Sequence, residues 1–255
     1  MKKIIFLLSF LILVSFSSVT ISANNKVYSW FCVHRKDHLQ PIADCSFDFI
    51  DEYDGFYIDK KHGDECDEKV IYLTFDAGYE NGNVEKILDI LDNEGVKGAF
   101  FVLGHLIEDN SQLVNRMFDG GHLVCNHTFS HKTMVGKSQQ DFKNELECLE
   151  RACIKATGRE LSKFYRPPEG KFDEQSLQYA KDLGYKTVFW SFAYADWDNN
   201  SQMNPEKAKK KILDNIHNGE IMLLHPTSET NAKILGEIIK ELKDQGYRFG
   251  TLDEL

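Results

Sequence analysis

The stretch Val70–Gly78, VIYLTFDAG, decides the fold of this chain. Residues 70–75 favour β-structure and carry no helical periodicity, a pattern typical of a buried strand. Asp76 stands where that strand would end, and Gly78 allows the chain to turn. In α/β proteins, catalytic groups lie at the carboxyl ends of buried parallel strands. Asp76 is therefore the first candidate for a functional side chain.

Predicted strands and helices alternate from this stretch to the C-terminus. Strands are expected at 70–75, 98–103, 122–126, 164–166, 186–192, 221–225 and 247–249. Helices are expected between them, at 84–94, 106–118, 138–157, 173–183, 205–217 and 231–244. About seven βα units with short connections indicate an α/β fold with a parallel sheet, and this number of units suggests a barrel.

The composition is that of a soluble globular protein with a core. Hydrophobic residues make up 42% of the 255 residues and charged residues 27%, which are ordinary values for this class. The length allows one large α/β domain or two small ones. The net charge is −10, and no run rich in Lys and Arg stands out. We therefore expect no nucleic acid or other polyanion to be held by a basic surface.

The first 23 residues have the pattern of an export signal. Lys2 and Lys3 form a basic start, residues 4–16 are apolar, and residues 17–23 are small and polar, with cleavage expected after Ala23. The alternative is an uncleaved membrane anchor that runs to about residue 21, but the apolar run is short for a spanning helix. Both interpretations place the rest of the chain outside the cytoplasm, with membrane attachment in the second.

Residues 24–68 differ in character from the rest of the chain. They are turn-rich and carry no motif, and we expect an N-terminal extension that packs on the main domain, 69–255. His34, His38 and His62 are expected at the surface rather than as ligands. Six cysteines occur, none in a CxxC pair; disulfides among them would suit an exported chain, and free thiols are equally compatible. They are Cys32, Cys45, Cys66, Cys125, Cys148 and Cys153.

Polar side chains come directly after several predicted strands, at the point where each strand ends. In a barrel of parallel strands these ends form one face, so we expect the side chains to converge there. They are Asp76, His127 with His131, Arg166, Asp196 and His225.

The two histidines, His127 and His131, are four residues apart and could bind one metal ion from a shared face. Local hydrogen bonding is the alternative role for each. Arg166-Pro-Pro-Glu-Gly170 predicts a rigid turn after a strand. Its arginine is either an ordinary surface residue or the partner that holds Asp76 ionised.

Two further sites suggest acid catalysis beside a sugar. Asp196 is followed by Trp197, whose flat ring would suit a sugar if it is exposed and the core if it is not. His225 ends the strand at 221–225. A single histidine there has either a structural role or, beside Asp196, the role of a general acid kept protonated by that partner.

In this order the motifs resemble those of the polysaccharide deacetylase family, the carbohydrate esterases that share the nodulation-protein deacetylase domain. The resemblance covers residues 69–255 and implies a distorted (β/α)7 barrel. It rests on five ordered motifs: Thr74-Phe75-Asp76-Ala77-Gly78, His127-x-x-x-His131, Arg166-Pro-Pro-Glu-Gly170, Asp196-Trp197 and Leu223-Leu224-His225.

The resemblance implies a role for each of these residues. Asp76 matches the catalytic base that activates the attacking water, Arg166 the residue that orients it, and His127 and His131 the ligands of a divalent metal, for which we expect Zn²⁺. Asp196 matches the acid that tunes the catalytic histidine, and His225 matches that histidine, which protonates the leaving amine. Leu223 matches a wall of the acetyl-methyl pocket. Substrate contacts fall on Tyr79, Trp197 and Glu169.

One departure from the family pattern is informative. The family has a second aspartate, its third metal ligand, where this chain has Ala77. Two family ligands therefore remain, and water, Asp76 or the substrate would complete the shell. The longer run from Thr74 to Gly82 resembles a subgroup of this kind: the δ-lactam-forming N-acetylmuramic acid deacetylases of endospore-forming bacteria. That resemblance implies action on peptidoglycan glycan strands of the spore cortex after an amidase has removed the stem peptides. We expect the protein to be a monomer. Another acetylated glycan, an N-acetylglucosamine polymer or a xylan, and a non-catalytic glycan-binding protein are the alternatives.

Overall fold

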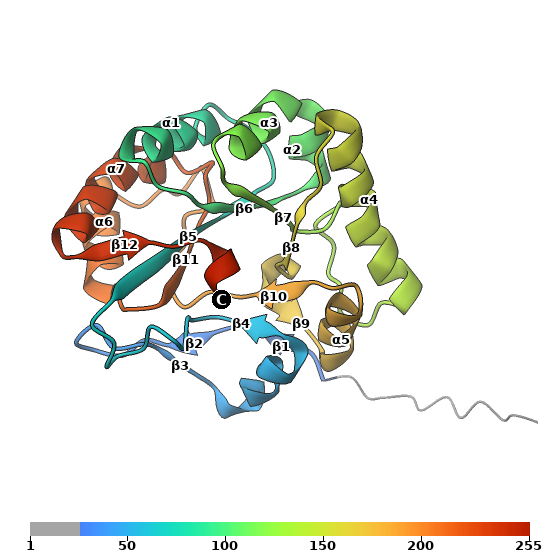
Figure 1. Cartoon of the computed structure of the whole chain (residues 1–255), viewed down its shortest axis with the longest axis horizontal. Helices are drawn as coiled ribbons and strands as arrows, with labels where there is room; N and C mark the ends of the chain where they lie inside the picture. The colour runs from blue at the N-terminus through green and yellow to red at the C-terminus, as the bar shows by residue number, and fades with distance from the viewer. Residues whose placement is uncertain (1–25) are drawn as a thin grey trace, which may run out of the picture.

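A computed structural model describes residues 26–255 (Figure 1). The expected export signal or anchor over 1–23 lies outside the described residues. Between residues 26 and 255, no helix is both long and apolar enough to cross a membrane.

The centre of the molecule is a parallel sheet curved into a barrel (Figure 1). The strand order is β11-β5-β6-β7-β8-β10-β4, and β12 pairs with β5 beside this path. The strands are β4 (Gly55–Phe56), β5 (Lys69–Ala77), β6 (Ala99–Val102), β7 (Leu123–Asn126), β8 (Ser162–Tyr165), β10 (Lys186–Val188), β11 (Glu220–Leu224) and β12 (Tyr247–Phe249). A bridge between Phe192 and Met222 joins the chain after β10 to β11 and completes the circle. This is the distorted (β/α)7 barrel that the sequence predicts.

Among residues 26–255, seven α-helices cover the outside of the barrel, at the top and both sides of Figure 1. They are α1 (Val84–Glu94), α2 (Gly104–Asp109), α3 (Ser111–Asp119), α4 (Gln139–Thr157), α5 (Glu174–Asp182), α6 (Pro205–Asn215) and α7 (Glu229–Asp244). The predicted start of α4 is confirmed, because the Ser138 hydroxyl accepts a hydrogen bond from the Asp141 amide at 3.1 Å. The single helix expected at 106–118 is wrong: Asn110, at φ −137°, breaks it into α2 and α3.

Strand β5 is buried on both faces, and its side chains point alternately into two separate hydrophobic cores. Val70 and Tyr72 point into the barrel, whereas Ile71 and Leu73 pack in the larger cluster under the helices. Ala77 belongs to that outer cluster too and is fully buried there.

Strand β10 is shorter than the expected 186–192, and Arg166 explains why. The Arg166 guanidinium donates to the carbonyls of Val188 at 3.0 Å and Phe189 at 3.2 Å. A carbonyl that accepts from a side chain is less available to a neighbouring strand, and the ladder ends at Val188.

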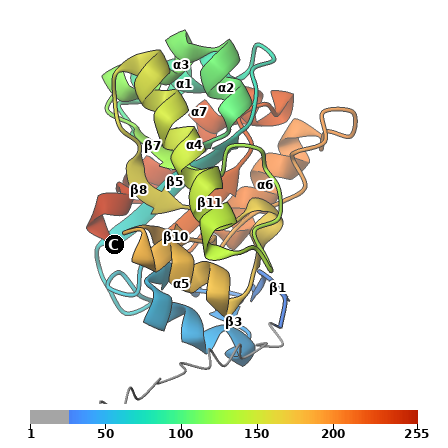
Figure 2. The ribbon, with the colours of Figure 1, turned by 90° about the vertical axis from the view of Figure 1, so that its right-hand side faces the viewer.

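The segment before β5 covers the remaining side of the barrel, at the bottom of Figures 1 and 2. It contains β1 (Tyr28–Ser29), β2 (Cys32–Val33), β3 (Ile42–Ala43), the 3₁₀ helix η1 (Cys45–Tyr53) and β4. Strand β4 extends the barrel sheet by pairing parallel with β10. The expectation of a surface His62 is wrong, because its ring is buried and lies 2.5 Å from an Asp59 carboxylate oxygen. All six cysteines of the described part of the chain are free thiols.

Candidate active site

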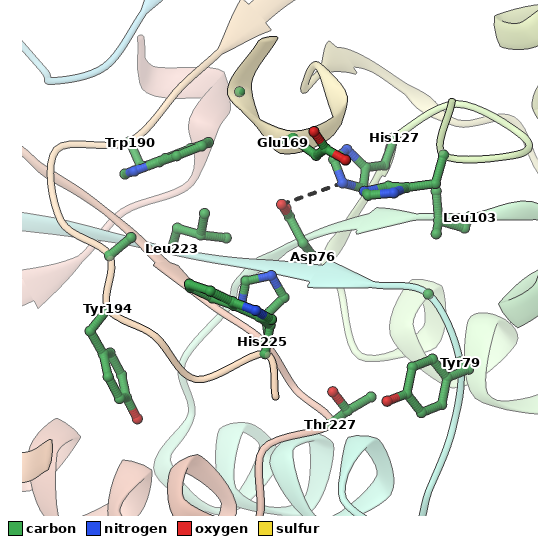
Figure 3. Close-up of a pocket in the computed structure, with 15 residues that line it drawn as sticks. Asp76, Tyr79, Leu103, His127, Glu169, Trp190, Tyr194, Leu223, His225 and Thr227 are labelled. Carbon is green, nitrogen blue, oxygen red and sulfur yellow. Dashed lines mark ion pairs between the residues drawn. The ribbon is translucent and has the colours of Figure 1, made fainter. Parts of the chain in front are cut away.

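A cavity of about 750 Å³ opens at the carboxyl ends of the barrel strands (Figure 3). Eight of the residues singled out in the sequence line it, and they come from the ends of β5, β7, β8, β10 and β11. They are Asp76, Tyr79, His127, His131, Glu169, Trp197, Leu223 and His225. Arg166 and Asp196 do not line the cavity; both are buried behind it and hold residues that do.

Asp76 is held from behind by Arg166. The Arg166 Nη1 donates to Asp76 Oδ1 at 2.8 Å, and its Nη2 donates to the Thr74 hydroxyl at 2.8 Å. With the two backbone carbonyls at the end of β10, these bonds leave the guanidinium completely buried and fixed in one orientation. The other Asp76 oxygen, Oδ2, remains directed to the cavity.

The surroundings of Asp76 favour its ionised form. Burial raises the pKa of this carboxyl, but the positive charges of His127, when protonated, and of Arg166 outweigh that effect, so the pKa lies below its ordinary value. Burial lowers the pKa of His127 to about 4, which leaves that imidazole neutral at pH 7. Arg166, together with His225 when that ring is protonated, then keeps Asp76 charged.

His127 presents a free lone pair to the cavity. Its Nδ1 lies 2.8 Å from the carbonyl of Arg166, and because a carbonyl only accepts, Nδ1 carries the proton. The other ring nitrogen, Nε2, lies 3.4 Å from Asp76 Oδ2, the contact that is dashed in Figure 3. Since neither atom carries a proton at neutral pH, a cation between them would relieve their repulsion.

His131 lies beside His127, with ring centroids 4.9 Å apart. The turn between them is unusual, because His131 and Thr128 both have left-handed backbones, at φ 56° and 70°. The His131 amide donates to the Thr128 hydroxyl at 3.0 Å, which supports this turn. Left-handed residues other than glycine are strained, and such strain gathers at functional sites.

These donors fit a divalent transition metal, although with a small protein shell. His127 Nε2 carries no proton and faces the cavity, the His131 ring lies beside it, and the carboxylate of Asp76 adds negative charge 3.4 Å from that nitrogen. Within residues 26–255, no three His, Cys, Asp or Glu side chains converge on one ion position. Ala77 faces the outer core and contributes nothing.

His225 lies across the cavity and is held by Asp196. Asp196 Oδ1 lies 2.7 Å from His225 Nδ1, and Oδ2 accepts the His225 amide at 2.8 Å. Asn231, at the start of α7, donates to the same Oδ2 at 2.6 Å. Burial lowers the pKa of His225, but the hydrogen bond and negative charge of Asp196 outweigh it and raise the pKa above its ordinary value. His225 is therefore arranged as a proton donor.

Two aromatic residues stand at the cavity mouth. The Trp197 side chain is 61% exposed and meets the His225 ring edge to face, at 6.2 Å. Tyr79 is 48% exposed, and its hydroxyl accepts a hydrogen bond from Asn199 at 2.6 Å. Glu169 lines the opposite wall in a left-handed conformation, φ 57°, and pairs with Lys171 at 2.5 Å.

Some residues of the site were given no role in the sequence analysis, although Thr74 and Trp190 stand in stretches that carry the resemblance. Thr74 and Asn231 position Arg166 and Asp196, while Trp190, Tyr194 and Thr227 line the cavity. The position of Thr74, two residues before Asp76 on the same strand face, was a usable signal. Asn231 had none, because it reaches Asp196 from the first turn of a helix that is distant in sequence.

Comparison with known proteins agrees with this geometry. The family pattern described as polysaccharide deacetylase matches residues 63–188. The peptidoglycan-N-acetylmuramic acid deacetylase PdaA of Bacillus subtilis (strain 168) is 40% identical over 232 residues, which cover 91% of this chain and 86% of PdaA.

Solved structures extend the agreement to the whole barrel. The structure of Bacillus subtilis PdaA, a family 4 carbohydrate esterase, superposes with a TM-score of 0.84 at 39% identity and covers 90% of this chain and 97% of that one. A family 4 carbohydrate esterase from Bacillus anthracis gives a TM-score of 0.73 at 36% identity, over 90% and 96% of the two chains. The chain therefore belongs to the polysaccharide deacetylases of carbohydrate esterase family 4, which are hydrolases.

Proposed function

We propose that this chain is a metal-dependent peptidoglycan N-acetylmuramic acid deacetylase. The proposal rests on two side chains that line the same cavity. Asp76 is kept ionised by Arg166, and His225 is kept protonated by Asp196. Amide hydrolysis needs both a base and an acid at once. The similarity to PdaA supports muramic acid as the sugar.

Asp76 and His225 each carry out one proton transfer of the reaction. Asp76 accepts a proton from the water that attacks the acetyl carbonyl carbon. His225 then gives its proton to the sugar nitrogen as the carbon–nitrogen bond breaks, which releases acetate and a free amine. Arg166 keeps Asp76 oriented through the attack, and Asp196 stabilises the imidazolium that is the proton donor.

His127 and His131 would hold the divalent metal, for which we propose Zn²⁺. When bound, such an ion supplies Lewis-acid polarisation of the acetyl carbonyl. The proton of His127 Nδ1 is fixed on the Arg166 carbonyl, so its Nε2 is kept free as a ligand. Without a third family ligand at Ala77, we expect this ion to exchange readily.

The cavity walls would recognise the sugar. Trp197 and Tyr79 offer exposed ring faces for a pyranose, and Leu223 forms an apolar wall for the acetyl methyl group. Glu169, on the opposite wall, is proposed to accept hydrogen bonds from sugar hydroxyls.

The proposed substrate indicates where in the cell the enzyme would act. We propose that residues 1–23 export or anchor the chain, that 24–68 extend the catalytic domain 69–255, and that the enzyme acts as a monomer in the cell wall or spore envelope. It would act after an amidase has exposed the lactyl carboxylate of muramic acid. The amine that deacetylation frees can then close a δ-lactam with that carboxylate, as in spore cortex.

Mass spectrometry of the released products tests the proposal. The enzyme is incubated with intact peptidoglycan and with peptidoglycan stripped of stem peptides by an amidase, each with and without a chelator. We expect acetate and a deacetylated or lactam-containing muramic acid only from the stripped sample that contains metal. Acetate from chitin or xylan oligomers alone would replace muramic acid as the substrate. No product from any glycan would favour a glycan-binding protein.

A further inference from the structure

The segment before the barrel reaches the wall of the catalytic cavity. Strand β1 pairs antiparallel with β9 (Lys171–Phe172), and the Trp30 amide continues the ladder by donating to the Gly170 carbonyl at 2.8 Å. Gly170 lines the cavity next to Glu169. One wall of the cavity is therefore hydrogen-bonded to a segment that carries no motif of its own.

The indole of Trp30 holds a second wall. Its Nε1 donates to the Trp190 carbonyl at 2.8 Å, and Trp190 also lines the cavity. Trp30 and Trp190 pack tightly against Gly170. A Cβ added at Gly170 would lie 2.8 Å from Trp190 Cη2 and 3.1 Å from Trp30 Cβ. Gly170 also has φ +64°, so a side chain there would be strained as well as crowded.

The same ring reaches the catalytic base in three contacts. Trp30 stacks on Phe189, with centroids 4.6 Å apart and planes 24° apart. The Phe189 carbonyl accepts from Arg166 Nη2, and Arg166 Nη1 donates to Asp76. Trp30 is 6% exposed, so its position is fixed by this packing.

We propose that Trp30 is a positioning residue of the active site, and that the extension serves catalysis by holding two cavity walls and the residue that orients Arg166. The indole N–H fixes the wall at Trp190, and so acts on substrate binding, while the backbone amide of Trp30 fixes the wall at Gly170. The ring stack fixes Phe189, and so acts on the catalytic step. This inference rests on the proposed function in taking the cavity as the site of deacetylation.

Two substitutions separate these contributions. Trp30→Phe keeps an aromatic ring for Phe189 but removes the N–H donor, so we expect KM to rise about fivefold with kcat nearly unchanged. Trp30→Ala also removes the stack on Phe189, so its kcat should be about tenfold lower than that of Trp30→Phe. The ring that Trp30→Phe retains should thus restore kcat. Phe31→Ala is the matched control: Phe31 is the next residue, is 50% exposed and meets only Phe47 among the rings of the described residues.

The test combines kinetics with hydrogen exchange measured by mass spectrometry. We expect both Trp30 variants, and not Phe31→Ala, to exchange faster at 189–192, where the Trp30 side chain makes its contacts. Unchanged KM and kcat per folded molecule, with exchange there no faster than in the control, would overturn the proposal. If the wild-type enzyme deacetylates only N-acetylglucosamine oligomers, the proposed substrate fails and the Trp30 comparison is decided on those oligomers. The exchange measurement needs no substrate.

Discussion

Arg166 Nη1 and Asp76 Oδ1 are 2.8 Å apart, and the arginine that makes this bond is completely inaccessible to solvent. A buried guanidinium is stable only when its donors are matched by well-placed acceptors. Here the acceptors are Asp76, a threonine on the same strand face, and two backbone carbonyls. The orientation of Asp76 is thus built into the end of the barrel.

Arg166→Lys should impair catalysis more than folding. Lysine keeps the charge but replaces a planar fork by a single ammonium, so it cannot serve Asp76 and the carbonyls together, and we expect kcat/KM to fall by about 100-fold. Arg159→Lys is the control, because Arg159 forms an exposed pair with Asp119 at 2.6 Å. Steady-state kinetics and thermal unfolding of both variants measure the effect. Near-normal activity of Arg166→Lys would show that orientation of Asp76 is unimportant.

Asp196→Asn should move the alkaline limb of the pH–rate profile to lower pH. The pKa of His225 is raised by Asp196, so the protonated donor is present below that pKa and is lost as pH rises through it. Without the carboxylate, burial prevails and the pKa falls, so the limb shifts down and kcat at neutral pH drops by about 100-fold. Asp198→Asn, an exposed neighbour, should leave the profile in place. An unmoved limb in Asp196→Asn would remove His225 from the acid role.

Metal should bind weakly and through the two histidines. Isothermal titration with Zn²⁺, after the protein has been stripped with a chelator, should show one site that His127→Ala or His131→Ala weakens by about 100-fold. His105→Ala changes an exposed histidine outside the cavity and should bind like the wild type. A stoichiometric ion that survives prolonged chelation would contradict the expected weakness.

Trp197→Ala should weaken substrate binding without affecting the proton transfers. The exposed ring would lose its contact with the sugar, so we expect KM to rise by about tenfold while kcat changes little. Trp197→Phe keeps a smaller ring, so its KM should lie between those of the wild type and of Trp197→Ala. Initial rates across a range of substrate concentrations separate KM from kcat. A lower kcat with an unchanged KM would instead mean that Trp197 acts through the His225 ring beside it.

Much of this arrangement could be predicted because strand ends in a barrel share one face. The rule brings Asp76, His127 and His225 to one cavity, as the structure does. It could not predict the early end of β10, which depends on Arg166 taking two carbonyls, nor β4, whose two residues are too few to carry a periodicity. Buried polar residues were hardest to predict: His62 lies inside because Asp59 binds it, and no local pattern records that contact.

Strand β5 has one consequence for how the molecule is assembled. One of its edges pairs with β11, while the other is shared between β12 near its start and β6 near its end. Two of these partners come from the last part of the chain, so the strand that carries Asp76 keeps an open edge until nearly all residues have been synthesised. Contacts of such long sequence separation form slowly, because loop closure must precede them. Asp76 should therefore be among the last groups to reach its final environment during folding.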